Sequence, residues 1–201
     1  MKRQIPLLLI VLRLILGFVV LMMAMMHAPA FAVWSIILLT IGLLSDVLDG
    51  IIAQRLQVST QRLRRLDSTV DQLFFVAVAI ATYLHCPAFF HAHLYALALL
   101  LSMEALTYVV SYIRFRKEIA THTLGAKFWT LILFATLVQL IAQCDSTWIF
   151  YTCITVGVIT RLEIVAIILT LKEWTNDVPT WYHAVRIRHG KPIQRNKLFN
   201  G

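Results

Sequence analysis

The sequence contains few charged residues for its length. Asp, Glu, Lys and Arg together make up 14% of its 201 residues, whereas an ordinary soluble domain contains roughly a quarter. Hydrophobic residues make up 60% of the chain, which is more than one internal core can hide. These proportions exclude a soluble globular protein and predict one integral membrane domain of several helices.

Cysteine and sequence repetition are also scarce. The three cysteines are too few for a disulfide framework. Cys86 and Cys144 fall near two expected outer connections, where an oxidising compartment would allow them to pair, and whether they do stays open. Cys153 is typical of a small buried apolar residue. There is no internal repeat or low-complexity tract, and nothing indicates a separate soluble domain.

Six apolar stretches are long enough, or nearly so, to cross the roughly 30 Å hydrocarbon core of a bilayer as helices. They cover residues 5–26, 31–52, 70–86, 89–112, 124–142 and 148–170. We therefore expect an all-α polytopic membrane protein with six transmembrane helices within residues 1–170. A basic cytoplasmic or interfacial tail follows at residues 171–201, where Trp174, Trp181 and Tyr182 are typical of an aromatic anchor at the membrane interface.

Lysine and arginine are absent from every second connection between these stretches. The connections after the first, third and fifth stretches contain none, whereas the N-terminus, the other connections and the C-terminal tail carry clusters. The positive-inside rule therefore places both termini in the cytoplasm. The net charge of +8 is then a topology signal and a contact surface for anionic lipid headgroups, with no nucleic-acid-binding motif beside it. A signal peptide is a weaker interpretation of the first stretch, because Arg13 interrupts it.

Four of the ten acidic residues are concentrated within 26 positions, inside the second stretch and at the start of the third: Asp46, Asp49, Asp67 and Asp71. Spacings of three and four place each pair on one helix face. An aspartate near the bilayer centre costs roughly 2.5–3.5 kcal/mol, so these carboxylates need a partner. An all-oxygen site suits Mg²⁺ or Mn²⁺ and not zinc. The alternative for the second pair, which leaves the first unexplained, is binding to the arginines at a helix start: Arg62, Arg64 and Arg65.

The aspartates, Gly50 and Ala53 have the spacing of a long signature, D-x2-D-G-x2-A-R-x8-G-x3-D-x3-D. On this motif the sequence resembles the CDP-alcohol phosphatidyltransferase (CDP-alcohol phosphotransferase) family. The resemblance extends over the whole chain, because six helices with the motif running from the second to the third are that family's architecture. Gln54 and Leu63 depart from the pattern, which has Arg and Gly at these positions.

The resemblance implies an integral membrane enzyme of phospholipid biosynthesis. Such an enzyme would transfer the phosphatidyl group of CDP-diacylglycerol to the hydroxyl of an acceptor alcohol and release CMP, with Mg²⁺ or Mn²⁺ as cofactor, in a two-metal site. We expect a homodimer in a bacterial cell membrane, with its active site on the cytoplasmic face. A short resemblance of Ile5, Pro6 and Arg13 to the start of bacterial phosphatidylglycerophosphate synthases favours glycerol 3-phosphate as the acceptor.

The resemblance also assigns roles to individual residues. The metal ligands it implies are Asp46, Asp49 and Asp67. The fourth carboxylate, Asp71, would be the base on the acceptor hydroxyl and part of the same metal site. The nucleotide end of the donor would lie against Gly50, Ala53 and Gln54. A side chain at Gly50 would obstruct the approach of the nucleotide to the helix backbone.

An acceptor that carries its own phosphate would need basic residues at the cytoplasmic ends of the helices, and four are available: Arg114, Arg116, Lys117 and Lys127. Lys127 begins the fifth stretch at a place resembling the family's basic residue near the acceptor pocket. A lysine that extends its ammonium to the membrane surface is an equal alternative. Arg13 and Arg161 lie deep enough to need structural partners, and Arg161 has either Glu163 or Glu104.

Two other functions stay open on the sequence alone. The changes at Gln54 and Leu63 are compatible with an inactive relative of the family. The aspartates would also serve as the ion site of a cation transporter or channel. An ion pathway needs acidic or polar groups at several depths, however, and the outer halves of the six stretches contain no acidic residue. The sequence therefore favours the enzyme.

Overall fold

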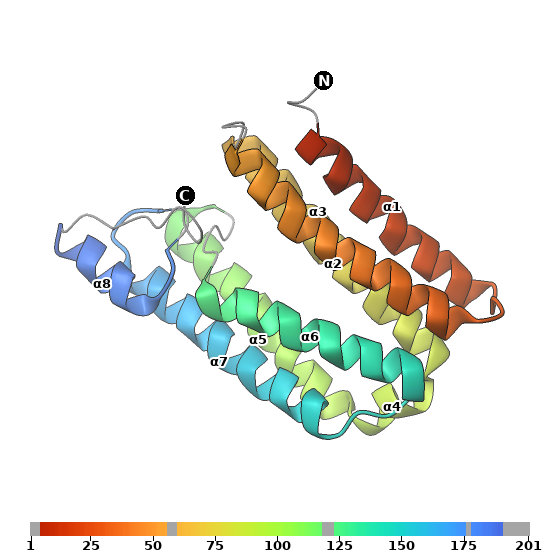
Figure 1. The fold of residues 1–201 in the computed structure, drawn as a ribbon. Helices are drawn as coiled ribbons and strands as arrows, with labels where there is room; N and C mark the ends of the chain where they lie inside the picture. Colours follow the sequence, from red (N-terminus) through yellow and green to blue (C-terminus); the bar gives the residue numbers. More distant parts are fainter. Residues whose placement is uncertain (1–4, 56–59, 118–122, 176–177, 191–201) are drawn as a thin grey trace. The chain divides into compact units, whose positions relative to one another are not determined.

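The computed structural model describes residues 5–55, 60–117, 123–175 and 178–190, and within these ranges the chain is helical without a strand. Eight helices follow one another in the order shown in Figure 1: α1 (Ile5–Met25), α2 (Phe31–Arg55), α3 (Gln61–His85), α4 (Pro87–Ala92), α5 (Leu94–Phe115), α6 (Leu124–Gln143), α7 (Trp148–Thr170) and α8 (Trp181–Arg188). Six of them, all but α4 and α8, are long and apolar enough to span a membrane. The prediction of an all-α protein with six transmembrane helices is confirmed.

The starts of two spanning helices differ from those expected from hydropathy. α3 begins at Gln61, nine residues before the apolar stretch, because Thr60 caps the helix: its hydroxyl accepts a hydrogen bond from the Leu63 amide at 3.2 Å. The fourth stretch was expected from residue 89, but the chain forms the short α4 first. His93, which is not helical, separates α4 from the spanning helix α5.

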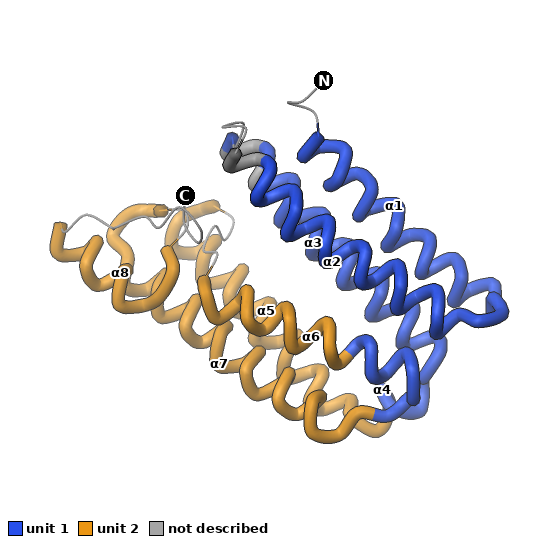
Figure 2. Tube along the Cα trace, in the orientation of Figure 1, with its two compact units in different colours: residues 1–91, 137–145 blue, residues 92–136, 146–201 orange. Residues whose placement is uncertain are grey.

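The described chain divides into two compact units, shown in different colours in Figure 2. The first contains residues 1–91 and 137–145, and the second contains residues 92–136 and 146–201, so α6 contributes to both. In the first unit α1 packs against both α2 and α3. In the second, α7 packs against α5 and α8.

One aromatic ring fixes the packing of α1, α2 and α3. Phe74 of α3, which is 1% exposed, lies against Gly17 of α1 and Gly42 of α2. A Cβ atom added at Gly17 would lie 3.2 Å from Phe74 Cδ2, and one added at Gly42 would lie 2.9 Å from Phe74 Cε1 and closer still to Cζ. The two glycines therefore provide the space that the ring fills. We call these three residues the glycine–phenylalanine layer.

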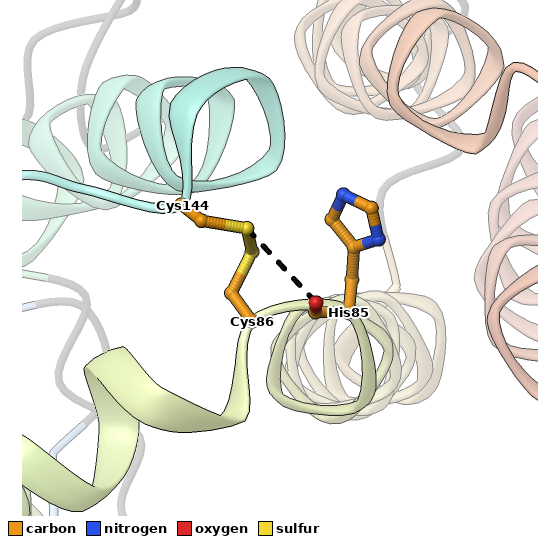
Figure 3. Close-up of side chains that lie close together, drawn as sticks. All are labelled: His85, Cys86 and Cys144. Atoms are coloured by element: carbon orange, nitrogen blue, oxygen red, sulfur yellow. Dashed lines mark hydrogen bonds between the residues drawn. A yellow bond between two sulfur atoms is a disulfide. The ribbon is translucent and has the colours of Figure 1, made fainter.

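The other end of the first unit is closed by a disulfide between Cys86 and Cys144 (Figure 3). It joins the residue that follows α3 to the residue that follows α6, across 58 positions of sequence. Near it, the ring of His85 lies 4.7 Å from the ring of Phe31, which begins α2. The pairing that the sequence left open is thus present, and Cys153 is free and buried.

The second unit contains a buried ion pair. Arg161 of α7 is 8% exposed, and its Nε donates a hydrogen bond to Glu104 Oε2 of α5 at 2.6 Å. Its guanidinium lies 3.7 Å from the ring centre of Trp129 on α6. Trp129 in turn donates to the carbonyl of Cys153 at 2.9 Å. Of the two acids that the sequence offered to Arg161, Glu104 is therefore the one bound.

The C-terminal part of the second unit folds back onto α7. Val178 and Ala184 pack with Ile167 and Leu171 in a small buried cluster. Trp181, half of whose surface is exposed, donates from Nε1 to the Thr170 hydroxyl at 3.1 Å. The aromatic anchor at the membrane interface stays a prediction. The remainder of the predicted tail, residues 191–201, lies outside the described residues.

Candidate metal and nucleotide site

The four aspartates of the motif lie on two helices of the first unit. Asp46 and Asp49 occupy one face of α2, and Asp67 and Asp71 occupy one face of α3. Oxygen atoms of Asp46, Asp49 and Asp67 all lie within 4.8 Å of one another. The structure therefore brings together the residues that the sequence predicted as ligands. We refer to these four residues as the aspartate cluster.

A buried arginine from α1 lies at the centre of the aspartate cluster. Arg13 is 1% exposed. Its Nη1 lies 3.2 Å from Asp46 Oδ1 and 3.1 Å from Asp67 Oδ1, and it also contacts Asp71 Oδ1. Its Nη2 contacts Asp49 Oδ2. Three helices thus meet through one guanidinium, and the structural partner that Arg13 was expected to need is the whole cluster.

The local structure holds Arg13 in this place. Its Nε donates to the hydroxyl of Ser45 at 3.4 Å, and that hydroxyl donates to the carbonyl of Gly42 at 2.8 Å. Gly17 follows Arg13 by one helical turn, and Gly42 precedes Asp46 by one turn. The glycine–phenylalanine layer therefore lies directly beneath the aspartate cluster and sets its register.

The members of the aspartate cluster differ in accessibility. The side chain of Asp49 is 3% exposed, whereas those of Asp46, Asp67 and Asp71 are 30–35% exposed. The cluster is therefore closed on the side of Asp49 and open on the side of the other three. A ligand that approaches the open side meets carboxylates of both α2 and α3.

The charge of the site favours a hard cation. Four carboxylates against one guanidinium leave an excess of three formal negative charges. Carboxylate oxygens are the ligands that Mg²⁺ and Mn²⁺ prefer. The donor set is all-oxygen, so the residues present fit such an ion. The structure shows Arg13 as a partner of Asp67 and Asp71. The alternative pairing with preceding arginines stays a prediction, and the side chains of Arg62 and Arg64 lie outside the described residues.

Gly50, expected beside the nucleotide, follows Asp49 on α2. Among the described residues, a Cβ atom added there would meet nothing within 4 Å, so their packing does not require a glycine at this position. Leu63, in the position of the signature's second glycine, is half-buried in the first turn of α3. α2 continues through Ala53 and Gln54, whose side chains lie outside the described part of the structure.

The basic residues expected at the acceptor site belong to the second unit. Arg114 donates to the carbonyl of Leu171 at 3.4 Å. Arg116 ends α5 in a left-handed conformation with φ 54°. Lys127 lies in the first turn of α6. Lys117, also named from the sequence, lies 4.8 Å from the ring centre of Trp174.

Sequence reasoning missed the contact between Arg13 and the aspartate cluster. The depth of Arg13 within an apolar helix indicated that it had a partner, but Asp49 and Asp67 are 36 and 54 positions away. The signal available in the sequence was the presence of one deep cation and four deep anions among the first three helices. That balance of charge would have indicated that Arg13 pairs with the aspartates, but not which oxygen atoms it contacts.

Comparison with protein families identifies the chain. The family described as CDP-alcohol phosphatidyltransferase matches residues 3–171, which is most of the sequence. The chain therefore belongs to the CDP-alcohol phosphatidyltransferase family, whose members transfer phosphatidyl groups from CDP-alcohols in lipid synthesis and generally depend on a metal ion. Comparisons with curated proteins and with solved structures gave no match.

Proposed function

We propose that this protein transfers the phosphatidyl group of CDP-diacylglycerol to the hydroxyl of glycerol 3-phosphate and releases CMP. The observation that carries the proposal is the convergence of carboxylates from α2 and α3, on the motif of the family, around one point of the first unit. We place this site at the cytoplasmic face of a cell membrane, because the basic connections lie at the same ends of the helices.

In this proposal Asp46, Asp49 and Asp67 hold one or two Mg²⁺ or Mn²⁺ ions. A bound ion would neutralise the charge of the pyrophosphate and of the departing CMP. The open side of the aspartate cluster admits the donor. The space beside Gly50 supports a place for the nucleotide, because no side chain of the described residues fills it.

The proposed reaction makes one bond and breaks one. The acceptor hydroxyl oxygen bonds to the phosphorus of the phosphatidyl group, and the bond from that phosphorus to the oxygen of CMP breaks. The hydroxyl proton passes to a carboxylate oxygen of Asp71. An aspartate with an ordinary pKa near 3.9 is a weak base, so this role requires that the proton leaves late, as a loose transition state allows.

Basic residues at the ends of α5 and α6 support an acceptor that carries a phosphate. If each of the six spans crosses the membrane once, the connection from α2 to α3 and that from α5 to α6 lie on the same side. Arg114, Arg116 and Lys127 are then on the side of the aspartate cluster. Three cations there support an acceptor that carries a phosphate, which is the basis for preferring glycerol 3-phosphate over serine or inositol.

The test is release of CMP from CDP-diacylglycerol by the purified protein in detergent. We expect release with glycerol 3-phosphate and Mg²⁺ or Mn²⁺, and none in excess chelator. Parallel reactions with serine, inositol, inositol phosphate and phosphatidylglycerol identify the acceptor. Release with a different acceptor would correct the substrate, release undiminished by chelator would contradict the metal site, and no release with any acceptor would contradict the proposed activity.

A further inference from the structure

The guanidinium of Arg13 contacts the same carboxylate oxygens that a metal ion would bind. Three carboxylate oxygens, from Asp46, Asp67 and Asp71, face the single atom Nη1, and Asp49 faces Nη2. Oxygen atoms gathered from two helices around one cationic atom resemble the arrangement that a metal ion would have. The distances differ, because Nη1 lies 3.1–3.2 Å from two of these oxygens and Mg²⁺ binds oxygen at about 2.1 Å.

We propose that Arg13 is an internal counter-cation, which shares the oxygens of the aspartate cluster with the divalent ion and thereby lowers the affinity of the site for that ion. The proposal rests on the proposed function, because it requires that the aspartates bind a metal. It adds a positioning residue from α1, a helix outside the motif. Arg13 acts on the metal through the carboxylates.

The burial of the site explains why a counter-cation is needed. Asp49 is 3% exposed, and a buried carboxylate without a partner is strongly destabilising. The carboxylates also repel one another at the separations found here, with three of them within 4.8 Å. Arg13 offsets both effects and keeps α1, α2 and α3 assembled without a divalent ion.

The same contacts oppose the binding of metal. A divalent ion needs oxygens that Arg13 already contacts, and it meets a like charge only a few Å away. Arg13 cannot withdraw far, because Ser45 binds its Nε and the glycine–phenylalanine layer lies one turn below. The affinity for the ion is therefore lower than that of the same carboxylates alone. A weaker site would bind and release the ion together with its substrates.

The direction in which loss of Arg13 changes the metal affinity distinguishes this role from a merely structural one. If Arg13 only held the helices together, its loss would disorder the aspartate cluster and weaken metal binding. If Arg13 shares the oxygens with the metal, its loss strengthens metal binding. A neighbouring charge within 4–6 Å shifts an ionic equilibrium by about one to three powers of ten, so we expect an effect of at least about tenfold.

The test measures the dissociation constant of Mn²⁺, by electron paramagnetic resonance of the free ion, with full-length protein and no substrate. We expect Arg13→Gln to bind Mn²⁺ at least about tenfold more tightly than the wild type and to gain more thermal stability from Mn²⁺. Arg161→Gln is the matched control, because Arg161 is the buried arginine of the second unit and pairs with Glu104. It should lower stability and leave the Mn²⁺ constant unchanged.

A charge-balanced pair of variants keeps the proposal testable if Arg13→Gln does not fold without metal. Asp71→Asn removes one negative charge, so Arg13→Gln in that background leaves the net charge of the wild-type cluster. We expect the double variant to bind Mn²⁺ about tenfold more tightly than Asp71→Asn alone. Equal or weaker binding on loss of Arg13 in both backgrounds would overturn the proposal and leave the proposed function standing. No Mn²⁺ binding by the wild type would overturn the metal site itself.

Discussion

Asp49 differs from its three neighbours because almost none of its surface is exposed. Its contact with Arg13 joins α1 to α2, and its carboxylate also faces Asp46 and Asp67. The exposed members contribute mainly to ligand binding, whereas Asp49 contributes to ligand binding and to the assembly of the helices. Equal substitutions in the cluster are therefore expected to have unequal effects on stability.

We predict that Asp46→Asn, Asp49→Asn and Asp67→Asn each lower the rate of CMP release at least about 100-fold, because each removes a charge that holds the metal ion. Asp49→Asn should also lower the thermal stability of the metal-free protein the most. Asp145→Asn is the control, since Asp145 is exposed and follows α6 at the opposite end of the first unit. Near wild-type turnover with unaltered Mg²⁺ dependence would remove a residue from the ligand set.

Asp71→Asn should separate binding from chemistry. The change removes the proposed proton acceptor and leaves Asp46, Asp49 and Asp67 to bind the metal and the donor. We expect turnover to fall about 10²-fold or more, while the variant retains its affinity for CDP-diacylglycerol. Both are measured on the same preparation, by CMP release and by equilibrium binding of the donor. Loss of donor affinity in step with the rate would make Asp71 a ligand and not a base.

The helices show which parts of the fold a sequence can predict. Long apolar runs identify the spans, because length and hydropathy are local properties. The polar first turns of α3 lower its hydropathy, so its start required the recognition of Thr60 as a cap. Glu163 was a poor candidate partner for Arg161, since residues two apart do not share a helix face. The choice of Glu104 depends on how α5 and α7 pack, which no local pattern gives.

In the aspartate cluster too, the sequence predicts contacts within one helix but not contacts that depend on how helices pack. The spacing within each pair was readable because it lies within one helix, and the motif linked the two pairs. The position of Arg13 depends on the rotation of α1 about its axis, and the glycine–phenylalanine layer fixes that rotation. Gly17, Gly42 and Phe74 form no motif in the sequence, so their contact could not be predicted.

Replacing glycine by alanine is expected to have opposite effects on stability at two positions of α2. Gly42→Ala would place a methyl group within 2.9 Å of the Phe74 ring carbons and should cost about 1–3 kcal/mol of stability. The methyl group of Gly50→Ala would meet none of the described residues within 4 Å, so this change should keep or raise the stability, since alanine favours helix by up to about 1 kcal/mol. Thermal unfolding in detergent measures both.

Enzyme activity and a second substitution test the same two glycine variants further. Gly50→Ala should raise the KM for CDP-diacylglycerol if the nucleotide approaches the backbone there. The further change Phe74→Leu should restore part of the stability lost in Gly42→Ala, because a smaller side chain makes room for the methyl group. A stable Gly42→Ala protein would contradict the packing described, and an unchanged KM for Gly50→Ala would contradict the place of the nucleotide.

For the whole molecule, the disulfide between Cys86 and Cys144 predicts both stability and topology. Closing 58 positions of chain is worth up to about 4 kcal/mol in the chain-entropy description. Reductant and the double variant Cys86→Ser with Cys144→Ser should each lower the temperature of inactivation. Reductant should have no further effect on the double variant, which is the control.

Because disulfides persist in oxidising compartments, we predict that the ends of α3 and α6 lie on the outer side of the membrane. After the disulfide is reduced, a membrane-impermeant thiol reagent added to the outside of intact cells should label these cysteines. Labelling from the cytoplasmic side only would reverse the predicted orientation.

The homodimer stays a prediction, which cross-linking in the native membrane would test.

The glycine–phenylalanine layer has a consequence for the barrier between the two sides of the membrane. Beyond it, away from the aspartate cluster, Val20, Leu39 and Val78 are fully buried, and the buried polar side chains described there are the uncharged hydroxyls of Ser35 and Thr82. Among the described residues of the first unit, no charged side chain is buried on that side of the layer. Charged groups can gather at one face of the first unit without opening a leak through it. A cell can therefore keep such a protein in an energised membrane without dissipating the gradients that the membrane maintains.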